Sequence, residues 1–155
     1  MRLLIAAAFI ATAALPALAQ DAHPGMLGGS TQVKWMPAPP VLPKGAMFAV
    51  IAGDPSKAGP FTIRLKMPAN YKVPAHHHPT AENVTILSGS FHAGMGDKLD
   101  MKKGMAFAPG GFAAIPANMN HYAWTTKETV LQVHGEGPFA MEYVNPADDP
   151  SKPTS

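Results

Sequence analysis

The stretch from Asn70 to Gly89 reads NYKVPAHHHPTAENVTILSG and places three consecutive histidines shortly before a glutamate. His76 and His78 are two residues apart, so on an extended chain their rings point to the same face, with Cα atoms about 6.6 Å apart. Two imidazoles at that separation can converge on one ion at roughly 2.0 to 2.1 Å each. His77 then points the opposite way. Once the chain turns, Glu82 can reach the same ion and add the negative charge that a divalent cation needs in a partly apolar pocket.

A second stretch, residues 110–124, reads GGFAAIPANMNHYAW and supplies one more histidine. The segment Pro116 to Met119 is typical of a tight turn, and His121 opens the strand that we expect after it. A ligand from a separate strand can help to enclose an ion, which one strand alone cannot do.

Short strands separated by turn residues are predicted for the rest of the domain. The clearest is Phe61 to Met67, where apolar and polar residues alternate with a period of two. Further strands are expected at residues 47–51, 82–87, 90–95, 105–108, 113–115, 121–125, 129–134 and 141–144. Strands this short and this regularly spaced indicate a sandwich or barrel.

The two histidine stretches resemble the two sequence motifs of the cupin superfamily, and the resemblance covers roughly residues 60 to 135. The first motif is matched by His76-x-His78-x₃-Glu82-x₆-Gly89, and the second by Gly110-x₅-Pro116-x-Asn118-x₂-His121. The resemblance implies an all-β, single-domain cupin jelly-roll β-barrel. It also implies that one divalent transition metal (Fe, Mn, Ni, Cu, Co or Zn) is bound by His76, His78, Glu82 and His121.

Three positions depart from the family pattern. Asn70 and Asn118 stand where the motifs usually have Gly, and Thr125 stands where the second motif usually ends in Asn. Asn also tolerates the left-handed backbone conformation, so we expect both turns to survive. None of the three positions is a ligand in the family.

The sequence as a whole is predicted to contain four segments. Residues 1–19 have the layout of a signal peptide, with a positive start, an apolar run and the small-x-small pattern Ala17-Leu18-Ala19. Residues 20–44 form a Pro/Gly-rich arm, residues 45–144 the barrel, and residues 145–155 a flexible tail. We therefore expect an exported protein, periplasmic or secreted, that has no membrane segment after cleavage.

The net charge and the lack of cysteine exclude several classes of partner and of chemistry. The formal net charge is +2, too small to steer nucleic acid or an anionic membrane. The chain has no cysteine, which excludes disulfides, thiolate zinc sites and cysteine nucleophiles. A small-molecule substrate or ligand is the expected partner, and the proline-rich part of the arm could cross to a second subunit in a homodimer.

Gln132 and His134 are candidate pocket residues whose orientation depends on the register of their strand. If Val130, Gln132 and His134 share the inner face, the two polar groups would contact substrate. In the other register Leu131 and Val133 face inward, and both polar residues lie on the surface.

Two functions are predicted from these residues, with a purely structural domain as a third possibility. Three histidines and a glutamate leave one or two coordination positions open, which permits a metal-dependent oxygenase or isomerase acting on a small organic molecule, with quercetinase-like dioxygenase chemistry as the comparison. Glu82 is the candidate catalytic residue, because it could also transfer a proton. The alternative is a periplasmic protein that binds a small ligand or metal without turnover.

Overall fold

The computed structural model describes residues 33–152 of the chain. The expected signal peptide (residues 1–19) and the first part of the expected arm (residues 20–32) lie outside the described residues. No helix within 33–152 is long and apolar enough to cross a membrane.

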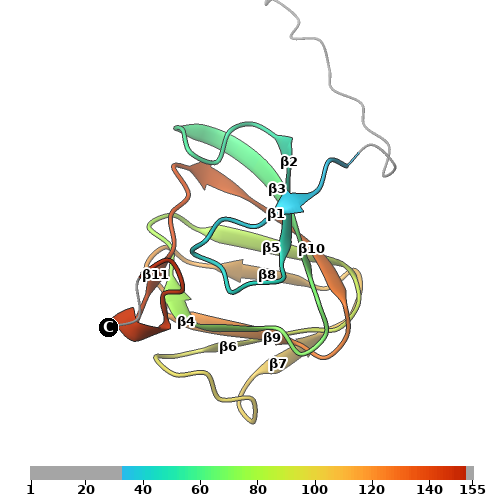
Figure 1. The fold of residues 1–155 in the computed structure, drawn as a ribbon, viewed down its shortest axis with the longest axis vertical. Coiled ribbons are helices and arrows are strands. Elements are labelled where there is room, and N and C mark those ends of the chain that lie inside the picture. The colour runs from blue at the N-terminus through green and yellow to red at the C-terminus, as the bar shows by residue number, and fades with distance from the viewer. Residues whose placement is uncertain (1–32, 153–155) are drawn as a thin grey trace, which may run out of the picture.

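Two antiparallel sheets face each other and make up almost all of the fold (Figure 1). The first sheet contains, in spatial order, β1 (Met36–Pro37), β2 (Met47–Ala52), β3 (Gly59–Met67), β10 (Thr129–Gly137), β5 (Glu82–Ser88) and β8 (Phe112–Ile115). The second contains β11 (Glu142–Tyr143), β4 (Lys72–His77), β9 (His121–Thr125), β6 (Phe91–Met95) and β7 (Met105–Phe107). Within residues 33–152 no ladder joins the edges of the two sheets, so the expected jelly-roll is a two-sheet sandwich and not a closed ring.

The main core lies between the sheets and follows from the period of two along the strands. On β3, Phe61, Ile63 and Met67 are buried, while Thr62 and Arg64 between them are partly exposed. Alternate residues of a strand point to opposite faces, so each sheet contributes one apolar row to the interior. The expected all-β class is therefore confirmed.

The turns that carry the two motifs keep the geometry expected of them. Asn70 and Asn118 have positive φ angles of 62° and 60°, so both occupy the left-handed region in which Asn replaces Gly at little cost. Gly89 has a φ of 92°, and a Cβ atom there would lie 2.2 Å from the Glu128 carbonyl oxygen. Only glycine fits that close approach.

The described part of the arm packs against the domain. Strand β1 pairs with β2, and the Lys66 ammonium lies 4.9 Å from the centre of the Trp35 ring. Past β1, the hydroxyl of Tyr143 donates to the Val41 carbonyl at 2.7 Å, and that of Tyr71 donates to the Pro43 carbonyl. These hydrogen bonds hold the arm on the rest of the fold.

The expected tail, residues 145–155, begins with a short ordered element. The side chain of Asn145 accepts a hydrogen bond from the Ala147 amide and starts the 3-10 helix η2 (Pro146–Asp148).

Candidate metal centre

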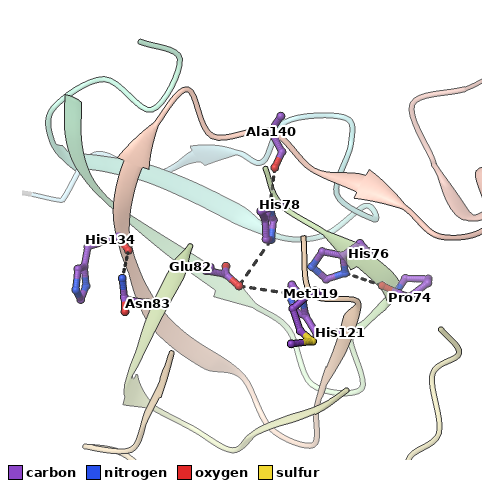
Figure 2. Close-up of polar contacts among 9 residues, drawn as sticks. All are labelled: Pro74, His76, His78, Glu82, Asn83, Met119, His121, His134 and Ala140. Carbon is purple, nitrogen blue, oxygen red and sulfur yellow. Dashed lines mark hydrogen bonds and ion pairs between the residues drawn. The ribbon is translucent and has the colours of Figure 1, made fainter. Parts of the chain in front are cut away.

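Three strand ends bring the four expected ligands together (Figure 2). His76 lies on β4 directly opposite His121 on β9, and His78 immediately follows β4. Glu82 is the first residue of β5, in the facing sheet. One ring nitrogen from each histidine lies within 4.8 Å of those of the other two. The Glu82 Oε2 atom lies 3.3 Å from His121 Nε2 and 3.7 Å from His78 Nε2.

Backbone carbonyls fix how each imidazole presents its nitrogens. The Nδ1 atoms of His76, His78 and His121 lie 2.7, 2.7 and 2.9 Å from the carbonyl oxygens of Pro74, Ala140 and Met119. A carbonyl oxygen can only accept, so each Nδ1 carries the hydrogen. In the neutral rings the Nε2 lone pairs are therefore free for a ligand, the arrangement that metal-binding histidines commonly adopt.

Burial favours the neutral form, which is the form that binds metal, in two of the histidines. Burial, reinforced by the neighbouring imidazoles of His121 and His78, lowers the pKa of His76 to about 3. Burial also lowers the pKa of His78. For Glu82, burial acts to raise the pKa, but the contact with His121 and the other nearby imidazoles outweigh it, so the pKa of the carboxyl lies below its ordinary value. The site thus combines the neutral imidazoles of His76 and His78 with an ionised carboxylate.

The side chains fit a divalent transition metal. The Nε2 atom of His78 is buried and has no hydrogen-bond partner. Lone pairs from three nitrogens and one carboxylate oxygen converge on the same small space, which is unfavourable unless a cation or a proton lies between them. Three imidazoles and one carboxylate suit iron, manganese, nickel, copper, cobalt and zinc alike.

A cavity of about 500 Å³ opens beside the four expected ligands and extends between the sheets. Among the described residues, the polar side chains that line it are these four and Ser56. The walls are aliphatic or aromatic, and come from both sheets and from the arm, through Pro39, Val41 and Leu42. An ion held by the four ligands would therefore face a largely apolar space large enough for a small molecule.

The structure corrects the placement of Gln132 and His134. Leu131 and Val133 of β10 are buried and line the cavity, so the second of the two expected registers is the one observed. Gln132 instead accepts a hydrogen bond from Arg64 Nε at 3.1 Å on the outer face. His134 is exposed and lies across β10 and β5 from the histidine cluster, beside Asn83 (Figure 2). Alternation along β10 sends these side chains outward once Leu131 and Val133 are buried.

Sequence reasoning missed the segment Phe139–Ala140, which supports His78. The Phe139 ring stacks on the His78 imidazole, with centroids 4.3 Å apart and planes 18° from parallel. The next residue, Ala140, supplies the carbonyl that accepts from His78 Nδ1. No motif spacing marks this segment, because it lies 62 residues beyond His78 and acts partly through its backbone.

His77 points away from the cluster, as expected, and its Nε2 atom lies 3.6 Å from Glu142 Oε2.

Comparison with known proteins agrees with this architecture. Residues 24–140 match the family model described as the ChrR cupin-like domain. No curated protein matches the chain.

Solved structures share the fold at low sequence identity. The polyketide cyclase RemF from Streptomyces resistomycificus superposes with a TM-score of 0.67 at 17% identity, covering 82% of this chain and 90% of that one. A putative acetylacetone dioxygenase from Methylibium petroleiphilum PM1 gives 0.64 at 18% identity, covering 88% and 90%. An RmlC-like cupin from Shewanella frigidimarina gives 0.56 at 11%, covering 73% and 91%. With its two-sheet fold, its histidine cluster and a family match over most of its length, the chain belongs to the ChrR cupin-like domain family of the cupin superfamily.

Proposed function

We propose that this cupin binds one divalent transition metal through His76, His78, Glu82 and His121 and is an enzyme of the oxygenase or isomerase type that acts on a small organic molecule in the cavity. The observation that carries the proposal is the convergence of three unprotonated Nε2 atoms and one carboxylate at the end of an apolar cavity. A purely structural metal site is usually closed on all sides. Here free space for a second molecule adjoins the ligands.

A metal bound there would supply Lewis acidity and, if redox-active, oxidation chemistry. The chain itself supplies orientation and exclusion of water. His76 and His121 are 5% and 3% exposed, so the fold shields both imidazoles from bulk water. Among the described residues Glu82 is the one carboxylate that lines the cavity, which makes it the group able to take or return a proton from a bound molecule.

The similar structures support the reaction class by analogy. One is named for polyketide cyclisation and another as a putative acetylacetone dioxygenase, two activities directed at carbonyl compounds. Shared fold does not establish shared chemistry. The same chemistry in this chain would require a carbonyl or phenolic substrate within the cavity.

Ligand binding without turnover is the second candidate. It is favoured by the absence of any further acid or base from the cavity lining in residues 33–152, apart from the four ligands. A binding protein needs no more than a metal and an apolar wall, whereas many enzymes add a separate general base.

A turnover assay separates the two candidates. Protein loaded separately with iron, manganese, nickel, copper, cobalt or zinc would be incubated with carbonyl and phenolic compounds, with O₂ consumption and product formed as the readouts. Turnover with at least one metal that is lost in Glu82→Gln, although that variant still folds, supports the enzyme. Tight binding of a compound that is recovered unchanged with every metal supports the binding protein.

A further inference from the structure

We infer that the molecule bound in this cavity has a single, singly anionic oxygen head, such as an enolate, phenolate or carboxylate, on an otherwise uncharged apolar body. This inference rests on the proposed function and adds the substrate class to it. It follows from where the polar groups lie in the cavity, from the charge that a metal centre would carry and from the apolar lining beyond the ligands.

Apart from Ser56, the polar side chains that line the cavity belong to the four ligands at one end, and the rest of the lining is apolar. The ligands stand at strand ends, with Glu82 opening β5 and His121 opening β9. One pleat further along the same strands, Val84 and Ala123 line the cavity, and neither offers a hydrogen bond from its side chain. Two residues of strand advance about 6.6 Å, so an occupant whose head reaches the ligands has its body against apolar side chains.

A divalent ion held by these residues would leave one positive charge unbalanced at the polar end. The ion would contribute two positive charges and Glu82 one negative charge, and imidazoles that bind a metal through Nε2 while Nδ1 donates to a carbonyl are neutral. One positive charge would therefore remain in an apolar enclosure, where charge is poorly solvated. No other acidic side chain of the described residues lines the cavity to neutralise it. An occupant with one anionic oxygen would make the centre neutral.

The wall one pleat beyond the ligands has little means of recognising a polar body. Ala93 on β6 and Ala123 on β9 lie directly opposite each other and form part of the cavity lining. Hydroxyl, amino or phosphate groups placed against such a wall would lose their water without gaining a partner, which is unfavourable for a neutral group and more so for a charged one. Sugars, amino acids and nucleotides are therefore disfavoured as occupants.

The pair Ala93 and Ala123 also creates the space for that body. Small side chains at both positions of a cross-strand pair leave room that larger residues would fill. A leucine at position 123 would extend into the cavity without replacing any of the four ligands. On β8, Ala114 is exposed and outside the cavity lining, so the same substitution there is a matched control.

The experiment uses protein loaded with Zn²⁺ or Co²⁺ under anaerobic conditions. The binding of four probes is measured by calorimetry and by the visible spectrum of the Co²⁺ form. Benzoylacetone and phenylbutyrate each offer one anionic oxygen head on an uncharged phenyl body. Butyrophenone has the carbon skeleton of benzoylacetone but no acidic head. Para-carboxybenzoylacetone adds a second charge at the far end.

We expect benzoylacetone, phenylbutyrate or both to bind and to change the Co²⁺ spectrum, and benzoylacetone to release one proton as it binds. Butyrophenone should bind at least about 10-fold more weakly, and the carboxylated probe about 100-fold more weakly, because a buried unpaired charge costs several kcal/mol. Ala123→Leu should keep its metal and lose the probe, whereas Ala114→Leu should keep both.

Three results would overturn the inference. If butyrophenone bound as tightly as benzoylacetone, the anionic head would not be required. If the carboxylated probe bound as tightly as benzoylacetone, the body would not need to be uncharged and apolar. If metal-loaded protein bound neither anionic probe, both parts of the inference would be contradicted. Metal content is measured in the same samples, so a protein that retains its ion but fails these tests leaves the metal site standing, whereas a protein that binds no ion contradicts the proposed function as well.

Discussion

Strand β9 is buried along its whole length, yet its two faces lie in very different surroundings. On the inner face, His121 and Ala123 border the cavity between the sheets. On the outer face, Tyr122 and Trp124 form a second, smaller core with Ala75, against which Leu99 and Val144 pack. Neighbouring residues of one strand thus belong to a hollow site and to a filled core.

The outer core is closely packed. A Cβ atom on Gly94 would lie 2.5 Å from the Tyr122 ring, and one on Gly104 would lie 2.1 Å from Trp124. The Tyr122 hydroxyl donates to the Asp100 carbonyl at 3.1 Å, and the Trp124 indole stacks on His92 with centroids 4.9 Å apart. The absence of side chains at two glycines makes room for these two large rings.

The difference between the faces suggests how stability and function are divided. The outer face buries large aromatic side chains without leaving space, so it stabilises the fold. The inner face keeps an open volume beside the ligands, which costs stability that a filled core would have supplied. Substitutions on the two faces should therefore have separable effects on unfolding and on metal binding.

The largest effect is expected on the outer face. Trp124→Ala should lower the free energy of unfolding by about 3–5 kcal/mol, because it removes a buried aromatic side chain and leaves a cavity. Urea unfolding of the metal-free protein measures the change. Phe112→Ala is the control, since Phe112 is 53% exposed and its loss should have little effect.

The comparison between the faces would fail if Trp124→Ala abolished metal binding in protein that is still folded at low temperature, because the outer core would then be part of the site.

A smaller effect on the inner side is expected at Phe139. Phe139→Ala should raise the dissociation constant for Zn²⁺ by about 10-fold, within the range seen when groups that orient metal ligands are lost. A competition titration with a chelating dye measures it. Phe139→Tyr keeps the stacked ring and should keep the affinity.

Equal loss of affinity in both Phe139 variants would contradict an orienting role for the ring.

The smallest effect is expected where the arm meets the domain. Tyr71→Phe removes the hydrogen bond to the Pro43 carbonyl and should cost about 1 kcal/mol at neutral pH. Burial raises the pKa of Tyr71 to about 12. The folded state therefore holds the phenolic proton more tightly than the unfolded state, so this contribution is complete below about pH 10 and is lost as the pH rises toward 12.

Unfolding measured at several alkaline pH values should show a weaker decline for Tyr71→Phe than for wild type. The difference in slope is at most about 1.4 kcal/mol per pH unit for one group. Parallel declines would show that Tyr71 does not titrate differently in the two states.

Much of the fold and of the ligand set could be predicted from local spacing. His76 and His78 were identifiable because strand alternation points both rings to one face, and the resemblance to the cupin motifs added Glu82 and His121. The structure brings these four side chains together. Asn70 and Asn118 were expected to preserve their turns, and both do.

What could not be predicted depends on register and on distant contacts. The inner face of β10 was ambiguous because both frames of the strand contain apolar and polar residues. The β5–β10 pairing also contains a register shift between Val130 and Leu131. The contacts of Thr125, which stands where the second motif usually has Asn, could not be predicted for a related reason. Its hydroxyl donates to the Pro68 carbonyl and accepts from the Tyr71 amide, two partners more than fifty residues away in the sequence. Such partners are set by the assembled sheets and not by local spacing.

We propose that the inner face of β9 holds a metal ion and that the packing of its outer face is not needed for metal binding. The stoichiometry and affinity of Zn²⁺ or Co²⁺ binding should be measured for wild type, His121→Ala and Trp124→Phe, with folding of each checked by circular dichroism. We expect one ion per chain in wild type and in Trp124→Phe, and at least about 100-fold weaker binding in His121→Ala, since loss of a ligand should exceed loss of a group that only orients one. Undiminished binding in His121→Ala, or no binding in wild type, would contradict it.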